Sequence, residues 1–289
     1  MSTAETRTAE ARNDAARTAG LALTEQGSGP AVLWVHGYTM DSSTWGPLWE
    51  LLPGWRHIGV DLPGHGRSGP FAPGLTLPRL AGQLAEVARA TGARRMVALS
   101  FGSTGALQLA IQEPELIERL VVAAPTLAGT ANEPSAKRRY QQLALLHRLT
   151  GPGEQLADLW MQSPPDIFLG TEQHPELRCA LRAVVVRHPW SELGSGAMDA
   201  LTAHRHTEAE LRRITARTLA VVGDQDMPAF VRNAELLRCT LADCRTLTVP
   251  GTGHLPLLER PEAVASAIAE HLTDSTDRTN ETDPNGGNR

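Results

Sequence analysis

The sequence predicts an α/β fold in which a mostly parallel central sheet is flanked by helices on both faces. Short apolar runs typical of buried strands lie at residues 31–35, 57–61, 95–99, 120–124, 218–223 and 245–249. Helical periodicity lies between most of them, at residues 77–90, 104–112, 229–238 and 261–271. Apolar strands that alternate with helices indicate a parallel sheet buried on both sides. The chemistry of such a protein is expected in the loops at the carboxyl ends of the strands.

One long segment interrupts this alternation. Residues 127–216 are helical and polar, and their one strand-like run is at 183–186. We expect this segment to be a helical cap that is inserted after the sixth strand, between core segments 19–126 and 217–272. A series of ordinary crossover helices is the alternative, but it would make an unusually long connection. Residues 1–18 and 273–289 are polar and are predicted to be disordered tails.

Composition excludes several classes of protein. The chain has 289 residues, enough for one large core with a modest inserted lobe, and its net charge of −5 disfavours a nucleic-acid binder. Its apolar runs are too short to cross a bilayer, and the first residues lack a secretory signal, so we expect a cytoplasmic protein without membrane contact. The cysteines, Cys179, Cys239 and Cys244, form no disulfide or zinc pattern, and we expect at least two of them in the core. The sequence does not predict the oligomeric state.

A serine lies in the turn after the third predicted strand. Ser100 follows that strand directly and precedes a helix, with the small residues Ala98 and Gly102 two positions away on either side. This arrangement is typical of a nucleophile elbow, whose usual pattern is Gly-x-Ser-x-Gly. Ala98 departs from the pattern, although alanine is still small. A serine before a helix is also a common N-cap, so this segment supports both interpretations.

Four further segments place polar residues at the carboxyl ends of predicted strands. They are Val35-His36-Gly37-Tyr38, Asp61-Leu62-Pro63-Gly64-His65-Gly66-Arg67-Ser68, Gly223-Asp224-Gln225-Asp226 and Gly251-Thr252-Gly253-His254. A serine hydroxyl needs a neighbouring base to become a good nucleophile. A histidine can be that base, and a carboxylate can fix the tautomer of the histidine.

Together these motifs resemble the α/β-hydrolase superfamily, and specifically its capped serine esterase and lyase-like branch, from Leu21 to Leu272. The resemblance implies a catalytic triad in the chain order serine, acid, histidine, which points to Ser100, Asp226 and His254. Asp226 is preferred as the acid because it lies deeper in its loop, and Asp224 is the alternative. The glycine-rich loop before His254 is expected to let this side chain swing toward Ser100.

The resemblance also implies an oxyanion hole formed by the backbone N–H groups of Tyr38 and Phe101. His36 is expected to hold its loop by hydrogen bonding. Asp61 and His65 precede Ser100 in the chain, which is the wrong order for triad members, so their loop is assigned to architecture.

We expect the reaction to be hydrolysis of a carboxylic ester, lactone or thioester of a small-to-medium apolar substrate. Haloalkane dehalogenases and epoxide hydrolases resemble this chain but carry an aspartate where Ser100 stands. An elimination, cyclisation or acyl-transfer enzyme and a non-catalytic binding protein remain alternatives. Candidate substrate-binding residues are Trp160, Met161, Phe168, Trp190, Met227 and Leu255. His204 and His206 are expected to be solvated, and neither a metal nor an organic cofactor is implied.

Overall fold

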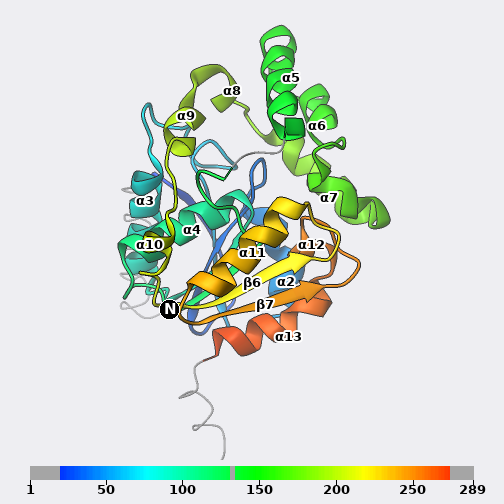
Figure 1. The fold of residues 1–289 in the computed structure, drawn as a ribbon. Coiled ribbons are helices and arrows are strands. Elements are labelled where there is room, and N and C mark those ends of the chain that lie inside the picture. Colours follow the sequence, from blue (N-terminus) through cyan, green and yellow to red (C-terminus); the bar gives the residue numbers. More distant parts are fainter. Residues whose placement is uncertain (1–19, 131–133, 274–289) are drawn as a thin grey trace, which may run out of the picture.

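The sheet of the protein has seven strands. The computed structural model describes residues 20–130 and 134–273, so nearly all of both predicted tails lies outside the described residues. The strand order is β1-β3-β2-β4-β5-β6-β7, and every neighbouring pair is parallel except the antiparallel pair of β1 and β3 (Figure 1). The strands are β1 (Ala22–Gln26), β2 (Ala31–Val35), β3 (Arg56–Asp61), β4 (Arg95–Leu99), β5 (Arg119–Ala123), β6 (Arg217–Gly223) and β7 (Cys244–Val249). The α/β fold with a mostly parallel sheet is therefore confirmed.

The edge strand β1 is absent from the sequence prediction. Its sequence, Ala-Leu-Thr-Glu-Gln, ends in three polar residues and has only one strongly apolar side chain. An edge strand pairs on one side only and faces water in part, so it lacks the continuous apolar run of the central strands. By contrast β2, β4 and β5 are buried at every position.

Helices cover both faces of the sheet, and alternate side chains of each strand reach opposite faces. In β2, Leu33 and Val35 join the apolar cluster under α3 (Leu77–Thr91), α4 (Phe101–Gln112) and α11 (Pro228–Thr240). Val32 and Trp34 join the second cluster, which packs against α2 (Gly46–Glu50) and α13 (Pro261–Leu272). The short helices η1 (Ser42–Trp45) and α12 (Pro256–Glu259) complete the layers.

The described residues between β5 and β6 form helices joined by turns. They are α5 (Pro134–Thr150), α6 (Glu154–Trp160), η2 (Asp166–Gln173), α7 (Pro175–Arg187), α8 (Glu192–Ser195), α9 (Ala197–Thr202) and α10 (Glu208–Leu211). Figure 1 shows α5, α6 and α7 gathered together at the upper right of the view, with α13 at the bottom, and residues of both groups join the second apolar cluster. By contrast, α9 contacts α3 and α10 contacts α4. The expectation that this segment follows a sixth strand was wrong, because it leaves the sheet after β5. The strand-like run at 183–186 belongs to α7.

The surface differs from the sequence prediction in two places. Cys179 and Cys239 are exposed, because they lie on the solvent-facing sides of helices, and Cys244 is half-buried at the start of the edge strand β7. The expectation of at least two cysteines in the core was therefore wrong. His204 and His206 are half-buried rather than solvated, and Nδ1 of His206 accepts a hydrogen bond from the N–H of Ala128. Burial lowers the pKa of His206 to about 4.

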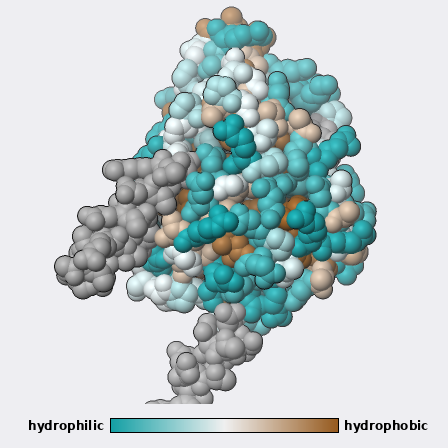
Figure 2. Space-filling view, turned by 90° about the vertical axis from the view of Figure 1, so that its left-hand side faces the viewer, coloured by the Kyte–Doolittle hydropathy of each residue, from teal (hydrophilic) through white to brown (hydrophobic). Residues whose placement is uncertain are grey.

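Hydrophilic side chains predominate on the face shown in Figure 2, with apolar residues scattered among them. None of the helices in residues 20–130 and 134–273 has the length and apolarity needed to cross a membrane.

Candidate active site

Ser100 occupies a strained turn between β4 and α4. Its φ of 50° and ψ of −120° lie in a region that residues with a side chain rarely adopt. Such a conformation costs about 1–3 kcal/mol and persists only where the surroundings impose it. Here the N–H of Ser100 donates to the carbonyl of Ala123 on β5 (2.8 Å), and Ser103 Oγ donates to the carbonyl of Ser100 (2.5 Å). These bonds hold the turn at the carboxyl edge of the sheet.

Close backbone approach explains why a glycine follows Ser100 by two residues. A Cβ at Gly102 would lie 2.4 Å from the carbonyl oxygen of His36 and 2.7 Å from that of Val35. Both obstacles are backbone atoms, so they cannot turn aside as a flexible side chain could. Ala98 is fully buried opposite Val35 of β2, and its methyl group fits, which explains how the first glycine of the usual pattern can be absent.

We expect Gly102→Ala to lower the free energy of unfolding by about 1–3 kcal/mol, because the added methyl group must displace the backbone at Val35 and His36. Gly82→Ala is the matched control. Gly82 lies inside α3 with open space at its Cβ position, so the same substitution should stabilise the protein by about 0.5–1 kcal/mol. Urea denaturation measures both. Equal effects at the two positions would contradict the close approach at Gly102.

His254 lies within hydrogen-bonding distance of Ser100. Its Nε2 is 2.8 Å from Ser100 Oγ, and its imidazole is fully buried against the ring of Phe230, with centroids 4.2 Å apart. The buried carboxylate of Glu259 accepts hydrogen bonds from the N–H groups on either side, those of Gly253 (2.7 Å) and Leu255 (3.0 Å). Glu259 thus holds the backbone on both sides of His254, and the imidazole reaches Ser100 from this loop.

Asp226 holds the other nitrogen of the imidazole. Its Oδ1 is 2.9 Å from Nδ1 of His254 and also accepts the N–H of Met227 (2.7 Å). Its Oδ2 is buried and has no hydrogen-bond partner among the described residues. The contact with Nδ1 holds the imidazole in the orientation in which Nε2 faces Ser100 Oγ.

Asp224, the alternative acid, has a different environment. It is exposed, and its Oδ1 accepts the N–H of Gly251 (2.8 Å) at the start of the loop that carries His254. Asp224 thus holds the backbone of that loop by a hydrogen bond, whereas Asp226 contacts the imidazole of His254 itself.

The loop formed by residues 36–41 lies beside the elbow. A Cβ at Gly37 would be 3.5 Å from Cβ of Ser100. Nδ1 of His36 lies 2.8 Å from the carbonyl oxygen of Gly37, and its Nε2 accepts the N–H of Leu62 (3.0 Å), so Nδ1 is the donor. Burial lowers the pKa of His36, which keeps the ring neutral, as this pair of bonds requires.

The hydrogen bond from His36 orients one peptide unit. In a trans peptide the C=O and N–H groups point in opposite directions. A bond to the carbonyl of Gly37 therefore restrains, from one side, the direction of the N–H of Tyr38, the first of the two predicted oxyanion donors. Phe101, the second, is the first residue of α4, and an N–H at this position has no partner within its own helix.

The candidate substrate-binding residues are all buried. Five of them, Trp160, Met161, Phe168, Trp190 and Leu255, share one apolar cluster with Tyr38. Met227 follows Asp226 and is also buried, outside that cluster. Trp160 has a polar function as well, because its Nε1 donates to Thr39 Oγ1 (2.8 Å).

Comparison with known proteins decides the family. The model of the family described as "Alpha/beta hydrolase family" matches residues 32–267. This chain belongs to the α/β hydrolase family. Among its relatives, the pimeloyl-[acyl-carrier protein] methyl ester esterase of Xanthomonas campestris pv. campestris is 29% identical over 250 residues, which cover 84% of this chain and 94% of that protein. The esterase of the same name from Yersinia enterocolitica is 26% identical and covers 83% of this chain and 92% of its own length.

The fold of this chain is also similar to those of solved esterase and lactonase structures. A thermophilic esterase from Thermogutta terrifontis aligns with a TM-score of 0.74 and 26% identity over 87% of this chain and 92% of its own. An enol-lactonase from Burkholderia xenovorans LB400 aligns with a TM-score of 0.72 over 88% of this chain and 96% of its own. At 22% identity that second likeness shows the fold alone. The chain is thus an enzyme of the hydrolase type.

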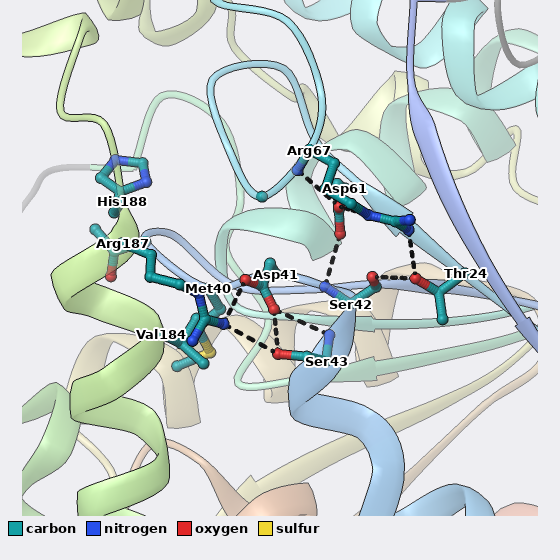
Figure 3. Close-up of a pocket in the computed structure, with 12 residues that line it drawn as sticks. Thr24, Met40, Asp41, Ser42, Ser43, Asp61, Arg67, Val184, Arg187 and His188 are labelled. Atoms are coloured by element: carbon teal, nitrogen blue, oxygen red, sulfur yellow. Dashed lines mark hydrogen bonds and ion pairs between the residues drawn. The ribbon is translucent and has the colours of Figure 1, made fainter.

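A cavity of about 320 Å³ in this hydrolase is lined in part by Thr39, Met40 and Asp41 of the 36–41 loop (Figure 3). Neither Ser100, Asp226 and His254 nor the candidate substrate-binding residues line it. Its carboxylates are already paired: Asp41 accepts from Ser43 and Arg187, and Asp61 accepts from the N–H groups of Ser42 and Arg67. These bonds brace the loops that flank the site, consistent with the architectural role expected for Asp61.

Sequence reasoning missed a buried polar group beside the site. The Tyr38 hydroxyl donates to Glu192 Oε1 (2.5 Å), and His188 Nε2 lies 3.0 Å from the same oxygen. His188 and Glu192 are four residues apart on either side of Trp190, a spacing that surface ion pairs share, so nothing in the sequence distinguishes them as buried. Within the described ranges, no group of three or more His, Cys, Asp or Glu side chains is arranged to hold a metal ion.

Proposed function

We propose that this hydrolase cleaves a carboxylic ester, lactone or thioester of a small-to-medium apolar substrate through an acyl intermediate on Ser100. The observation that carries the proposal is the chain of contacts from Ser100 Oγ to His254 Nε2 (2.8 Å) and from His254 Nδ1 to Asp226 Oδ1 (2.9 Å). The names of the bacterial relatives, which are methyl ester esterases, support an ester as the substrate.

In the proposed first half-reaction, Ser100 Oγ attacks the carbonyl carbon of the substrate while His254 accepts the hydroxyl proton. Asp226 stabilises the resulting imidazolium. The negative charge that develops on the carbonyl oxygen is stabilised by the N–H groups of Tyr38 and Phe101, each of which is worth about 3 kcal/mol in such sites. His254 then protonates the departing alkoxide or thiolate, and the acyl group remains on Ser100.

In the second half-reaction a water molecule replaces the alcohol. His254 accepts a proton from the water as its oxygen attacks the acyl carbon, and then returns the proton to Ser100 Oγ as the carbon–oxygen bond to the enzyme breaks. The acid leaves with one oxygen from water. Neither half-reaction requires a cofactor.

We further infer that helices α5–α8 form the cap, and that Trp160, Met161, Phe168, Trp190, Met227 and Leu255 line the pocket for the apolar part of the substrate. The shared apolar cluster of five of these side chains supports this inference. Binding there would be driven by removal of apolar surface from water.

Product analysis in ¹⁸O-labelled water tests the proposed reaction. Hydrolysis of a panel of short-chain methyl and p-nitrophenyl esters, lactones and thioesters should place one solvent oxygen in the released acid, as measured by mass spectrometry. An alkene product would instead indicate elimination, and an acyl group found on an added nucleophile in place of water would indicate a transferase.

A further inference from the structure

The 36–41 loop is attached to the helices between β5 and β6 by three hydrogen-bonded contacts. They join Tyr38 to Glu192 (2.5 Å), Thr39 to Trp160 (2.8 Å) and Asp41 to Arg187 (3.0 Å). Figure 3 shows the last of them, with Arg187 of α7 reaching the carboxylate of Asp41. The loop that carries a proposed oxyanion donor therefore depends for its position on residues more than a hundred positions later in the chain.

The three contacts differ in strength. The side chain of Arg187 is 56% exposed, and an ion pair in such a position contributes little. The side chains of Tyr38 and Glu192 are buried, so their bond is protected from water and joins a hydroxyl to a carboxylate. Hydrogen bonds to a charged group are shorter and about twice as strong as neutral ones. The Tyr38–Glu192 contact is therefore the dominant one.

The ionisation states of the two side chains suit this bond. Burial, followed by the charge of Glu192, raises the pKa of Tyr38 well above its usual value, so the hydroxyl keeps its proton and donates it. Burial opposes ionisation of Glu192, but hydrogen bonds from His188 and Tyr38 outweigh burial and lower the pKa of its carboxyl. A neutral phenol thus donates to a carboxylate.

The backbone next to Tyr38 requires such support. Thr39 has a φ of 63°, in the left-handed region that β-branched residues rarely adopt. Its hydroxyl donates to the carbonyl of Tyr38 (2.6 Å) and accepts from Trp160. A strained residue keeps its conformation only while neighbouring contacts enforce it, so loss of the Tyr38 side-chain bond leaves the loop fewer restraints.

We propose that Glu192 is a positioning residue that acts through the Tyr38 side chain to aim the Tyr38 N–H at the oxyanion. This inference rests on the proposed function, because it requires a transition state with charge at that point. His188 supports Glu192 by sharing the same carboxylate oxygen. Glu192 belongs to α8 of the proposed cap, so the oxyanion site is complete only when this helix is seated on the core.

Three variants test the proposal: Tyr38→Phe, Glu192→Leu and the double variant. Each single change should lower kcat by roughly 10- to 100-fold with KM changed by less than about threefold, since a misdirected donor costs somewhat less than the removal of one. The double variant should be little worse than Tyr38→Phe, because both changes break the same contact.

Two further variants serve as controls. Glu192→Gln, which keeps an acceptor oxygen, should recover part of the loss in kcat. Glu176→Leu replaces an exposed carboxylate on α7 and should leave kcat unchanged.

Binding of two inhibitors separates positioning from general damage. A trifluoromethyl ketone forms a tetrahedral adduct with an oxyanion, whereas the carboxylic acid product does not. Affinity for the ketone should fall in Tyr38→Phe and Glu192→Leu by the same factor as kcat/KM, while affinity for the acid stays the same.

Folded variants with wild-type ketone affinity, or with equal losses of ketone and acid affinity, would overturn the role of Glu192 and leave the proposed function intact. If the wild-type enzyme itself neither hydrolyses esters nor forms the adduct, the proposed function fails first.

Discussion

Replacing Ser100 with alanine is expected to lower kcat/KM for ester hydrolysis by a factor on the order of 10⁴–10⁶. The change removes the atom that would form the acyl intermediate and leaves water as the sole nucleophile. Initial rates with a p-nitrophenyl ester measure the loss, and circular dichroism shows whether the fold persists. His254→Ala should give a loss of the same order, and combining the two changes should add little, because the two residues act as one unit.

A serine away from the site provides the control. Ser266 lies on the exposed side of α13, and Ser266→Ala should leave kcat/KM unchanged. A Ser100→Ala enzyme that is folded and still turns over more than about one-hundredth as fast as the wild type would show that another group attacks the substrate.

Replacing Asp226 with asparagine should lower kcat by a factor on the order of 10³–10⁴. An asparagine can turn its amide group toward Nδ1 of His254, which then holds the wrong tautomer, with the proton on the nitrogen that faces Ser100 Oγ. The neutral side chain also no longer stabilises the imidazolium. The loss should remain below that of Ser100→Ala, because the nucleophile, the base and the oxyanion donors are still present.

Asp224→Asn is the matched control for that experiment. It removes the neighbouring carboxylate but keeps an oxygen that can accept the N–H of Gly251, so kcat should fall by less than about tenfold. If Asp224→Asn were the more damaging change, the acid of the triad would be Asp224, and the observed contact of Asp226 with His254 would not be the functional one.

The sequence was sufficient to predict the centre of the fold and the contacts of the candidate triad. The predicted strand bounds 31–35 and 95–99 match β2 and β4, because both strands are apolar at every position. Ser100 directly follows β4, and Asp226 and His254 lie in the loops that follow β6 and β7, so the topology brings all three to the carboxyl edge of the sheet.

The parts that were missed depend on contacts between distant segments. Glu259, which fixes the backbone around His254, lies in an ordinary helical sequence, and its role arises only because α12 turns back on the loop. Glu192 likewise meets Tyr38 across 154 positions of the chain. Cys179 and Cys239 show the reverse case, since an apolar residue type on a helix does not reveal which side of the helix faces water.

The measurement that tests the central claim most directly is intact-mass labelling with a fluorophosphonate probe, which reacts with a serine only when a neighbouring base activates it. We expect one adduct per chain on the wild-type enzyme and none on Ser100→Ala, with the Ser266→Ala control labelled as fully as the wild type. An adduct that persists on Ser100→Ala, or a folded wild-type protein that takes up no probe, would contradict an activated nucleophile at Ser100.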